Sequence, residues 1–135
     1  MLKGIPSILS PELLKILMEM GHGDTIAIGD GNFPHASIAK NSILVRLDGH
    51  GAVEVLDAIL TLFPLDTYVD APVSLMEVVP GDTVVPVIWE AYKALLNYYE
   101  PETEVHKIER FAYYERAKKA YAARSKMQHP EQFWK

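Results

Sequence analysis

The stretch "EMGHGDTIAIGDGNFPHAS", residues 19–37, contains a helix end, a short strand and a turn in immediate succession. Gly21 is a helix-stopping residue, and the apolar run 25–28 is too short for a helix and typical of a buried strand. The turn residues "GDGNFP" end this strand and leave Asp30 just beyond its carboxyl end. Because His22 stands before the same strand, the segment places an imidazole and a carboxylate at its two ends.

Strands alternate with helices on both sides of this stretch. Ser10 and Pro11 fit an N-cap and a first helical position, and apolar residues follow at helical spacing as far as Gly21. This alternation indicates an α/β fold with a mainly parallel sheet flanked by helices. The further strands are expected at 42–47, 71–79 and 105–108, and the further helices at 52–63, from Pro86 onward and at 110–126.

Composition describes an ordinary globular chain. Of its 135 residues, 49% are hydrophobic and 23% charged, so we expect a single compact domain covering residues 1–135. No window approaches the roughly 18 apolar residues of a membrane span, and no signal-peptide core opens the chain, which predicts a cytoplasmic protein. The net charge of -5 argues against nucleic acid or anionic lipid as a partner. Without cysteine, disulfides and thiol catalysis are excluded.

Familiar cofactor motifs are missing from the sequence. "GDGNFP" is not a dinucleotide fingerprint, because Pro34 occupies the position of the third glycine. The five histidines are too dispersed for a metal-ligand spacing, although His22, Asp30 and His35 could converge on folding. We therefore predict neither a cofactor nor a metal.

Each candidate residue also has an ordinary structural interpretation. His22 suits proton transfer beside a loop carboxylate, yet a histidine at a helix end can simply meet the terminal carbonyls. Asp30 can bind a ligand or only shape the turn that "DGN" predicts, and Arg110 can be a plain surface charge. Spacing alone leaves these alternatives open.

Two segments, "MLKGIPSILSPELLKILMEMGHGDTIAIGDGNFPHAS" and "RFAYYERAKKAY", resemble the RbsD/FucU family of sugar mutarotases, over roughly residues 1–121. "RFAYYERA" is similar to the L-fucose mutarotase branch. The resemblance implies a cofactor-free isomerase that interconverts the α and β anomers of a monosaccharide, most of all L-fucose. It also implies a homo-oligomer, commonly a ring-like decamer, with sugar sites near subunit interfaces.

The same resemblance assigns roles to three residues: His22 as the catalytic acid and base, and Asp30 and Arg110 as sugar-binding groups. The chain departs from the family after Tyr121, where "AARSKMQHPEQFWK" contains no Tyr-Gly-Asn or Tyr-Ala-Asn motif of the sugar pocket. The alternative is therefore a non-catalytic monosaccharide-binding or sensing oligomer. The sequence leaves open the preferred sugar, the oligomer size and what replaces this motif.

Overall fold

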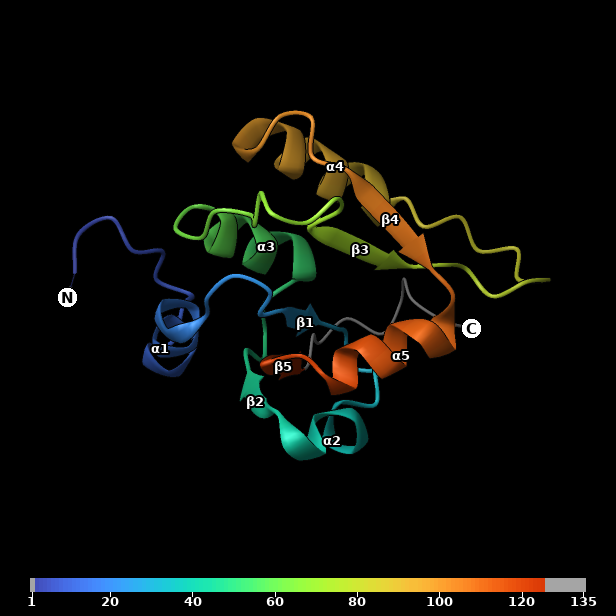
Figure 1. The fold of residues 1–135 in the computed structure, drawn as a ribbon, viewed down its shortest axis with the longest axis horizontal. Helices are drawn as coiled ribbons and strands as arrows, with labels where there is room; N and C mark the ends of the chain where they lie inside the picture. Colours follow the sequence, from blue (N-terminus) through green and yellow to red (C-terminus); the bar gives the residue numbers. More distant parts are fainter. Residues whose placement is uncertain (1, 126–135) are drawn as a thin grey trace.

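The computed structural model describes residues 2–125, and all strand pairs within them are parallel (Figure 1). The α/β class with parallel strands is confirmed, but the strands divide between two small sheets instead of forming one. The first sheet has the order β1-β5-β2, and the second pairs β3 with β4. The strands are β1 (Ile26–Ile28), β2 (Ile43–Arg46), β3 (Val73–Met76), β4 (Val105–Ile108) and β5 (Ala122–Ser125).

Helices connect and cover these strands. In Figure 1, α4 lies beside the two-stranded sheet, and α5 runs close to α2 below it. The packing of α4 against α3 joins the region of the second sheet to the core of the first. The helices are α1 (Pro11–Glu19), α2 (His35–Ile38), the 3-10 turn η1 (Ala39–Asn41), α3 (Ala52–Leu60), α4 (Ile88–Tyr99) and α5 (Arg110–Lys118).

The predicted start of α1 is confirmed in detail. The Ser10 side chain accepts a hydrogen bond from the Leu13 amide at 3.2 Å, and Pro11 occupies the first turn, where its missing N–H costs nothing. Pro86 was expected at the first position of the next long helix, but α4 begins two residues later, at Ile88. The Pro86 carbonyl, two residues before the helix, instead accepts a hydrogen bond from the Trp89 amide at 3.0 Å.

The predicted C-terminal end of the last helix was wrong. Instead of continuing to residue 126, α5 ends at Lys118, and β5 follows as the middle strand of the first sheet. Ala122 pairs with Ile26 on one side and Ile43 on the other, and it is only 1% exposed. Two backbone ladders outweigh the helix preference of the local alanines, which is the strongest of any residue type but amounts to less than about 1 kcal/mol per residue. Residues 126–135, including the final part of that expected helix, lie outside the described residues.

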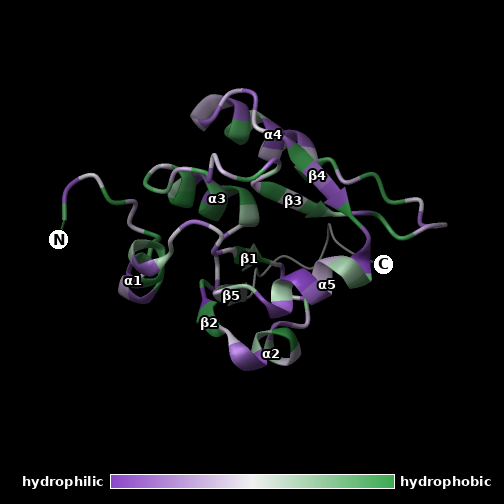
Figure 2. Cartoon of the chain, in the orientation of Figure 1, coloured by the Kyte–Doolittle hydropathy of each residue, from purple (hydrophilic) through white to green (hydrophobic). Residues whose placement is uncertain are grey.

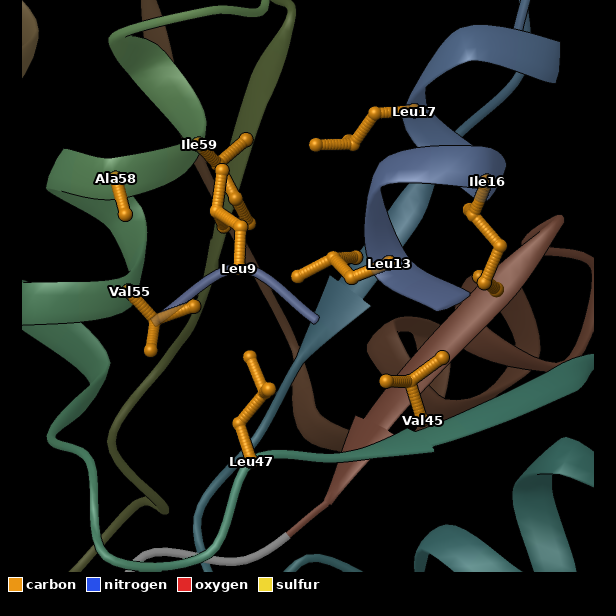
Figure 3. Packing of buried hydrophobic residues seen from close by; sticks show 10 residues of the cluster. Leu9, Leu13, Ile16, Leu17, Val45, Leu47, Val55, Ala58 and Ile59 are labelled. Carbon is orange, nitrogen blue, oxygen red and sulfur yellow. The ribbon is translucent and has the colours of Figure 1, made fainter. Parts of the chain in front are cut away.

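The main core lies between α1, α3 and the first sheet (Figure 3). Leu13 of α1 and Val55 of α3 are fully buried, and each such side chain contributes about 1.5–3 kcal/mol by leaving water. Figure 2 shows α3 as largely apolar, whereas α5 mixes hydrophilic and more hydrophobic residues along its length. The buried cluster consists of Leu9, Leu13, Ile16, Leu17, Val45, Leu47, Val55, Ala58, Ile59 and Ala122.

A second, smaller cluster fixes α5 to the first sheet. Apart from Ile38, its buried members are alanines, including Ala27 of β1 and Ala117 of α5, so the helix can approach the strand closely. Phe33 and Tyr114 close the edge of this cluster. Within the described residues, no helix is long and apolar enough to cross a membrane.

Candidate functional site

His22 lies in the loop between α1 and β1, where its side chain is 74% exposed. Its Nδ1 is 3.1 Å from Oδ1 of Asp66, which belongs to the loop between α3 and β3. The edge-on ring of Tyr68 lies 4.6 Å from the imidazole, measured between ring centroids. His22 is therefore an accessible imidazole held from one side by a carboxylate and an aromatic ring.

Backbone amides fix the Asp66 carboxylate. The Tyr68 amide donates to Oδ1 at 2.9 Å, and the Gly23 amide donates to Oδ2 at 3.0 Å. These two hydrogen bonds, in that order, and then the contact with His22 lower the pKa of Asp66 below its ordinary value. A carboxylate ties the two loops together at neutral pH, with the imidazole as one of its partners.

Asp30 lies beyond the carboxyl end of β1, as the sequence predicted, and it shapes the turn there. Its Oδ1 accepts from the amides of Asn32 and Phe33 at 2.9 and 3.0 Å. The Asp30 carbonyl accepts from Nε2 of the buried His35 at 2.8 Å. The turn-forming interpretation of Asp30 is thus realised, and it places a negative charge at the edge of the sheet.

His22, Asp30 and His35 do not form a metal-ligand group. His35 contacts the backbone of Asp30, whereas His22 pairs with Asp66. Among residues 2–125, no three histidine or acidic side chains are arranged to hold an ion.

Aromatic contacts connect the turn after β1 with α5. The ring of Phe33 lies 4.8 Å from His35, 6.0 Å from Tyr113 and 5.5 Å from Tyr114, in each case edge to face. Such pairs stabilise by about 0.5–1.5 kcal/mol beyond the area that they bury. Burial also raises the pKa of the Tyr113 hydroxyl. The turn that carries Asp30 is therefore fixed against the first half of α5.

Arg110 is the first residue of α5, and its guanidinium carbon lies 4.7 Å from the Phe111 ring centroid. Its Nε is buried and has no hydrogen-bond partner within the part of the chain that the structure describes. A buried N–H without an acceptor is costly, by about 1–3 kcal/mol or more for a charged group. A ligand oxygen would satisfy this N–H group.

The structure places the three predicted residues in two regions. Asp30 and Arg110 belong to segments joined through Phe33 and α5, whereas His22 lies across the three residues of β1, about 10 Å of strand. No hydrogen bond or ion pair among residues 2–125 links His22 to Asp30 or Arg110. Neither Asp66 nor Tyr68 could be predicted as a site residue, because "PLDTYV" is typical of a turn and His22, the partner of Asp66, is 44 residues away.

The fold and these residues define a class: small α/β proteins with parallel strands, whose connecting loops carry an imidazole–carboxylate pair and a separate arginine. The model of the RbsD / FucU transport protein family matches residues 3–124. The chain belongs to that family, so the resemblance found in the two sequence segments is confirmed.

Relatives and solved structures agree with this assignment. The L-fucose mutarotase of Actinobacillus pleuropneumoniae serotype 5b is 49% identical over 123 residues, which are 90% of this chain and 84% of that protein. FucU from Bifidobacterium longum is 56% identical with a TM-score of 0.89, over 95% of this chain and 92% of the other. The fucose mutarotase of Streptococcus pneumoniae, solved with L-fucose, is 46% identical with a TM-score of 0.85, over 93% and 88% of the two chains.

Proposed function

We propose that the protein is a sugar mutarotase that interconverts the α and β anomers of a monosaccharide, with L-fucose as its preferred substrate. The observation that carries this function is the 49% identity to an L-fucose mutarotase across 90% of the chain. A second solved neighbour, at 46% identity, holds L-fucose itself. The exposed imidazole of His22 supplies a group suited to the chemistry.

Mutarotation needs only proton transfers and one reversible bond cleavage. A base removes the proton of the anomeric hydroxyl, and the protonated base then gives a proton to the ring oxygen, so the bond between the anomeric carbon and that oxygen breaks. The open-chain aldehyde rotates about its first carbon–carbon bond and closes on the other face, and the two proton transfers run in reverse. His22 acts as this base and acid in turn, because imidazole does both near neutral pH.

Asp30 and Arg110 bind the sugar in this proposal. The Asp30 carboxylate accepts from sugar hydroxyls, and the buried Nε of Arg110 donates to a sugar oxygen and gains the partner that it lacks. Asp30 lies at the opposite end of β1 from His22, which suits contact with hydroxyls away from the reacting carbon. Fixed hydroxyls hold the ring in a reactive orientation.

Saturation-transfer NMR of anomer exchange tests the function, with L-fucose, D-ribose and D-galactose compared. His22→Ala is expected to remove most of the acceleration but preserve L-fucose affinity, because the lost contact matters in the transition state. Arg110→Ala is expected to weaken binding by about 1.5–3 kcal/mol in calorimetric titration. His50→Ala and Arg116→Ala are the matched controls, since these side chains pair instead with Glu54 and Ser74.

The alternative is a monosaccharide-binding or sensing oligomer without catalysis. It is favoured by the departure of the residues after Tyr121 from the family pattern. Wild-type protein that binds L-fucose but exchanges its anomers no faster than buffer would support this alternative. If the His22→Ala variant exchanges anomers as fast as the wild-type protein, His22 has no part in the mechanism.

We also propose that the protein acts in the cytoplasm as a homo-oligomer, commonly a decamer in its family, with sugar sites near subunit interfaces. The segment 77–87 supports assembly, because it extends from β3 away from the body of the molecule (Figure 1). Val85 and Val87 on this segment are 78% and 73% exposed. Apolar side chains on a projecting segment gain stability when another subunit covers them.

A further inference from the structure

Asp66 is the carboxylate that contacts His22, and its loop has no role in the mechanism above. We propose that Asp66 is a positioning residue: it holds the imidazole of His22 with the proton on Nδ1 and thereby presents Nε2 as the atom that exchanges protons with the sugar. This inference rests on the proposed function, which it refines to a single reacting nitrogen.

The contact with Asp66 determines which ring nitrogen of His22 carries the proton. An ionised carboxylate only accepts hydrogen bonds, so the 3.1 Å contact between Oδ1 of Asp66 and Nδ1 of His22 requires an N–H on that nitrogen. The two backbone amides that lower the pKa of Asp66 keep the carboxylate ionised at neutral pH. In neutral imidazole the other nitrogen, Nε2, then has the free lone pair.

The Asp66 carboxylate is itself held rigidly. Asp66 accepts from the Tyr68 and Gly23 amides, so its carboxylate is anchored to the backbone on both loops. Its side chain is only 21% exposed, whereas that of His22 is 74% exposed. The Tyr68 ring adds an edge-on contact to the imidazole. One face of His22 is therefore fixed while its remaining surface is open to a substrate.

The other titratable groups on the two loops do not replace Asp66. Asp24 accepts from the Gly21 amide at 2.9 Å, which directs that carboxylate to its own backbone. Tyr68 meets the imidazole through its ring, and Asp70 forms no ion pair among the described residues. Of these groups, Asp66 alone contacts the His22 ring nitrogen.

NMR of protein labelled with ¹⁵N in histidine tests the tautomer directly. The wild-type protein is expected to show the neutral imidazole of His22 with a protonated Nδ1 and an unprotonated Nε2. The reverse tautomer would overturn the proposal without any variant. The measurement also remains informative if the mutarotase function fails, because it needs no sugar.

Asp66→Asn tests the consequence for exchange. The amide keeps an acceptor for the backbone but can donate to Nδ1, which favours the opposite tautomer. We expect an inverted ¹⁵N pattern and a loss of kcat for L-fucose of at least about tenfold. This loss is a part of the roughly 10²–10⁴-fold acceleration that acid–base catalysis supplies in total. The value of KM should change less than about twofold, because His22 acts chiefly in the transition state.

Asp24→Asn is the matched control, since it removes a neighbouring carboxylate that contacts only backbone. It is expected to retain the wild-type tautomer and exchange rate. Circular dichroism checks that both variants fold. An Asp66→Asn protein with wild-type tautomer, or with wild-type kcat and pH profile, would overturn the assignment.

Discussion

Gly29 allows the turn that carries Asp30 to pack closely, because glycine has no side chain. A methyl group added to its backbone would lie 2.7 Å from Cγ of Phe33 and 2.9 Å from Cε1 of His35. Those two rings contact each other and attach the turn of Asp30 to α5. The close approach of the strand end to these rings therefore depends on a residue without a Cβ.

Gly29→Ala is expected to destabilise the fold by about 1–3 kcal/mol, since the Phe33 and His35 rings must shift to admit the methyl group. The displaced turn should also weaken L-fucose binding through Asp30. Urea unfolding and calorimetric titration measure the two effects. Gly21→Ala is the control, because nothing lies within 4 Å of its added Cβ, and we expect a change within about 0.5 kcal/mol. Equal effects of the two substitutions would contradict this packing argument.

Individual residues were predictable from the sequence where their partners are local. Asp30 was placed correctly at the strand end, because its turn involves residues only two and three positions away. The pairing of His22 with Asp66 joins residues 44 positions apart, and no periodicity encodes such a contact. The same holds for the ring contacts between Phe33 and Tyr114.

At the scale of one element, α5 begins with a charge-dependent cap. The Glu109 carboxylate accepts from the amides of Phe111 and Ala112 at 2.9 and 3.1 Å. These two bonds, in that order, and then the charge of Arg110 lower the pKa of Glu109 below its ordinary value of 4.5. The helix that carries Arg110 is thus anchored by an ionised side chain.

The sign of the resulting pH dependence follows from the lowered pKa. The stabilisation by Glu109 is complete above the ordinary carboxyl value and is lost as pH falls through the lower folded value. Urea unfolding from neutral into acidic pH should therefore show Glu109→Gln less stable than wild type at neutral pH, with the difference closing as pH falls below the ordinary carboxyl value. The exposed Glu102→Gln serves as control and should show no such closure. A difference that is constant with pH would contradict the charged cap.

At the scale of the whole molecule, the projecting segment 77–87 carries apolar side chains that are exposed in the described part of the chain. If these side chains are buried between subunits, Val85→Asp should lower the mass measured by light scattering at micromolar concentration, because a charge would enter an apolar contact. Thr83→Asp is the control, since it adds the same charge to an exposed polar position nearby. A monomeric wild-type protein would contradict the assembly.

The overall class of the molecule followed from the sequence, whereas its sheet order did not. Short apolar runs and helix caps are local signals, and they located β1 to β4 and the starts of α1, α3 and α5. For the middle strand β5 the local sequence predicts a helix, because its alanines are strong helix formers and its two strand partners lie far earlier in the chain. Long-range pairing also decided the division into two sheets.

The position of β5 between β1 and β2 has a consequence for synthesis of the protein. The ribosome completes β2 at Arg46 but reaches the end of β5 only at Ser125. At about 5–20 residues per second, this interval lasts on the order of 4–16 s. During that time the nascent β1 and β2 have exposed hydrogen-bonding edges and no common partner. The first sheet must therefore assemble only after β5 has been synthesised. Until then, the unpaired edges of β1 and β2 are the parts of the nascent chain that most need protection by chaperones.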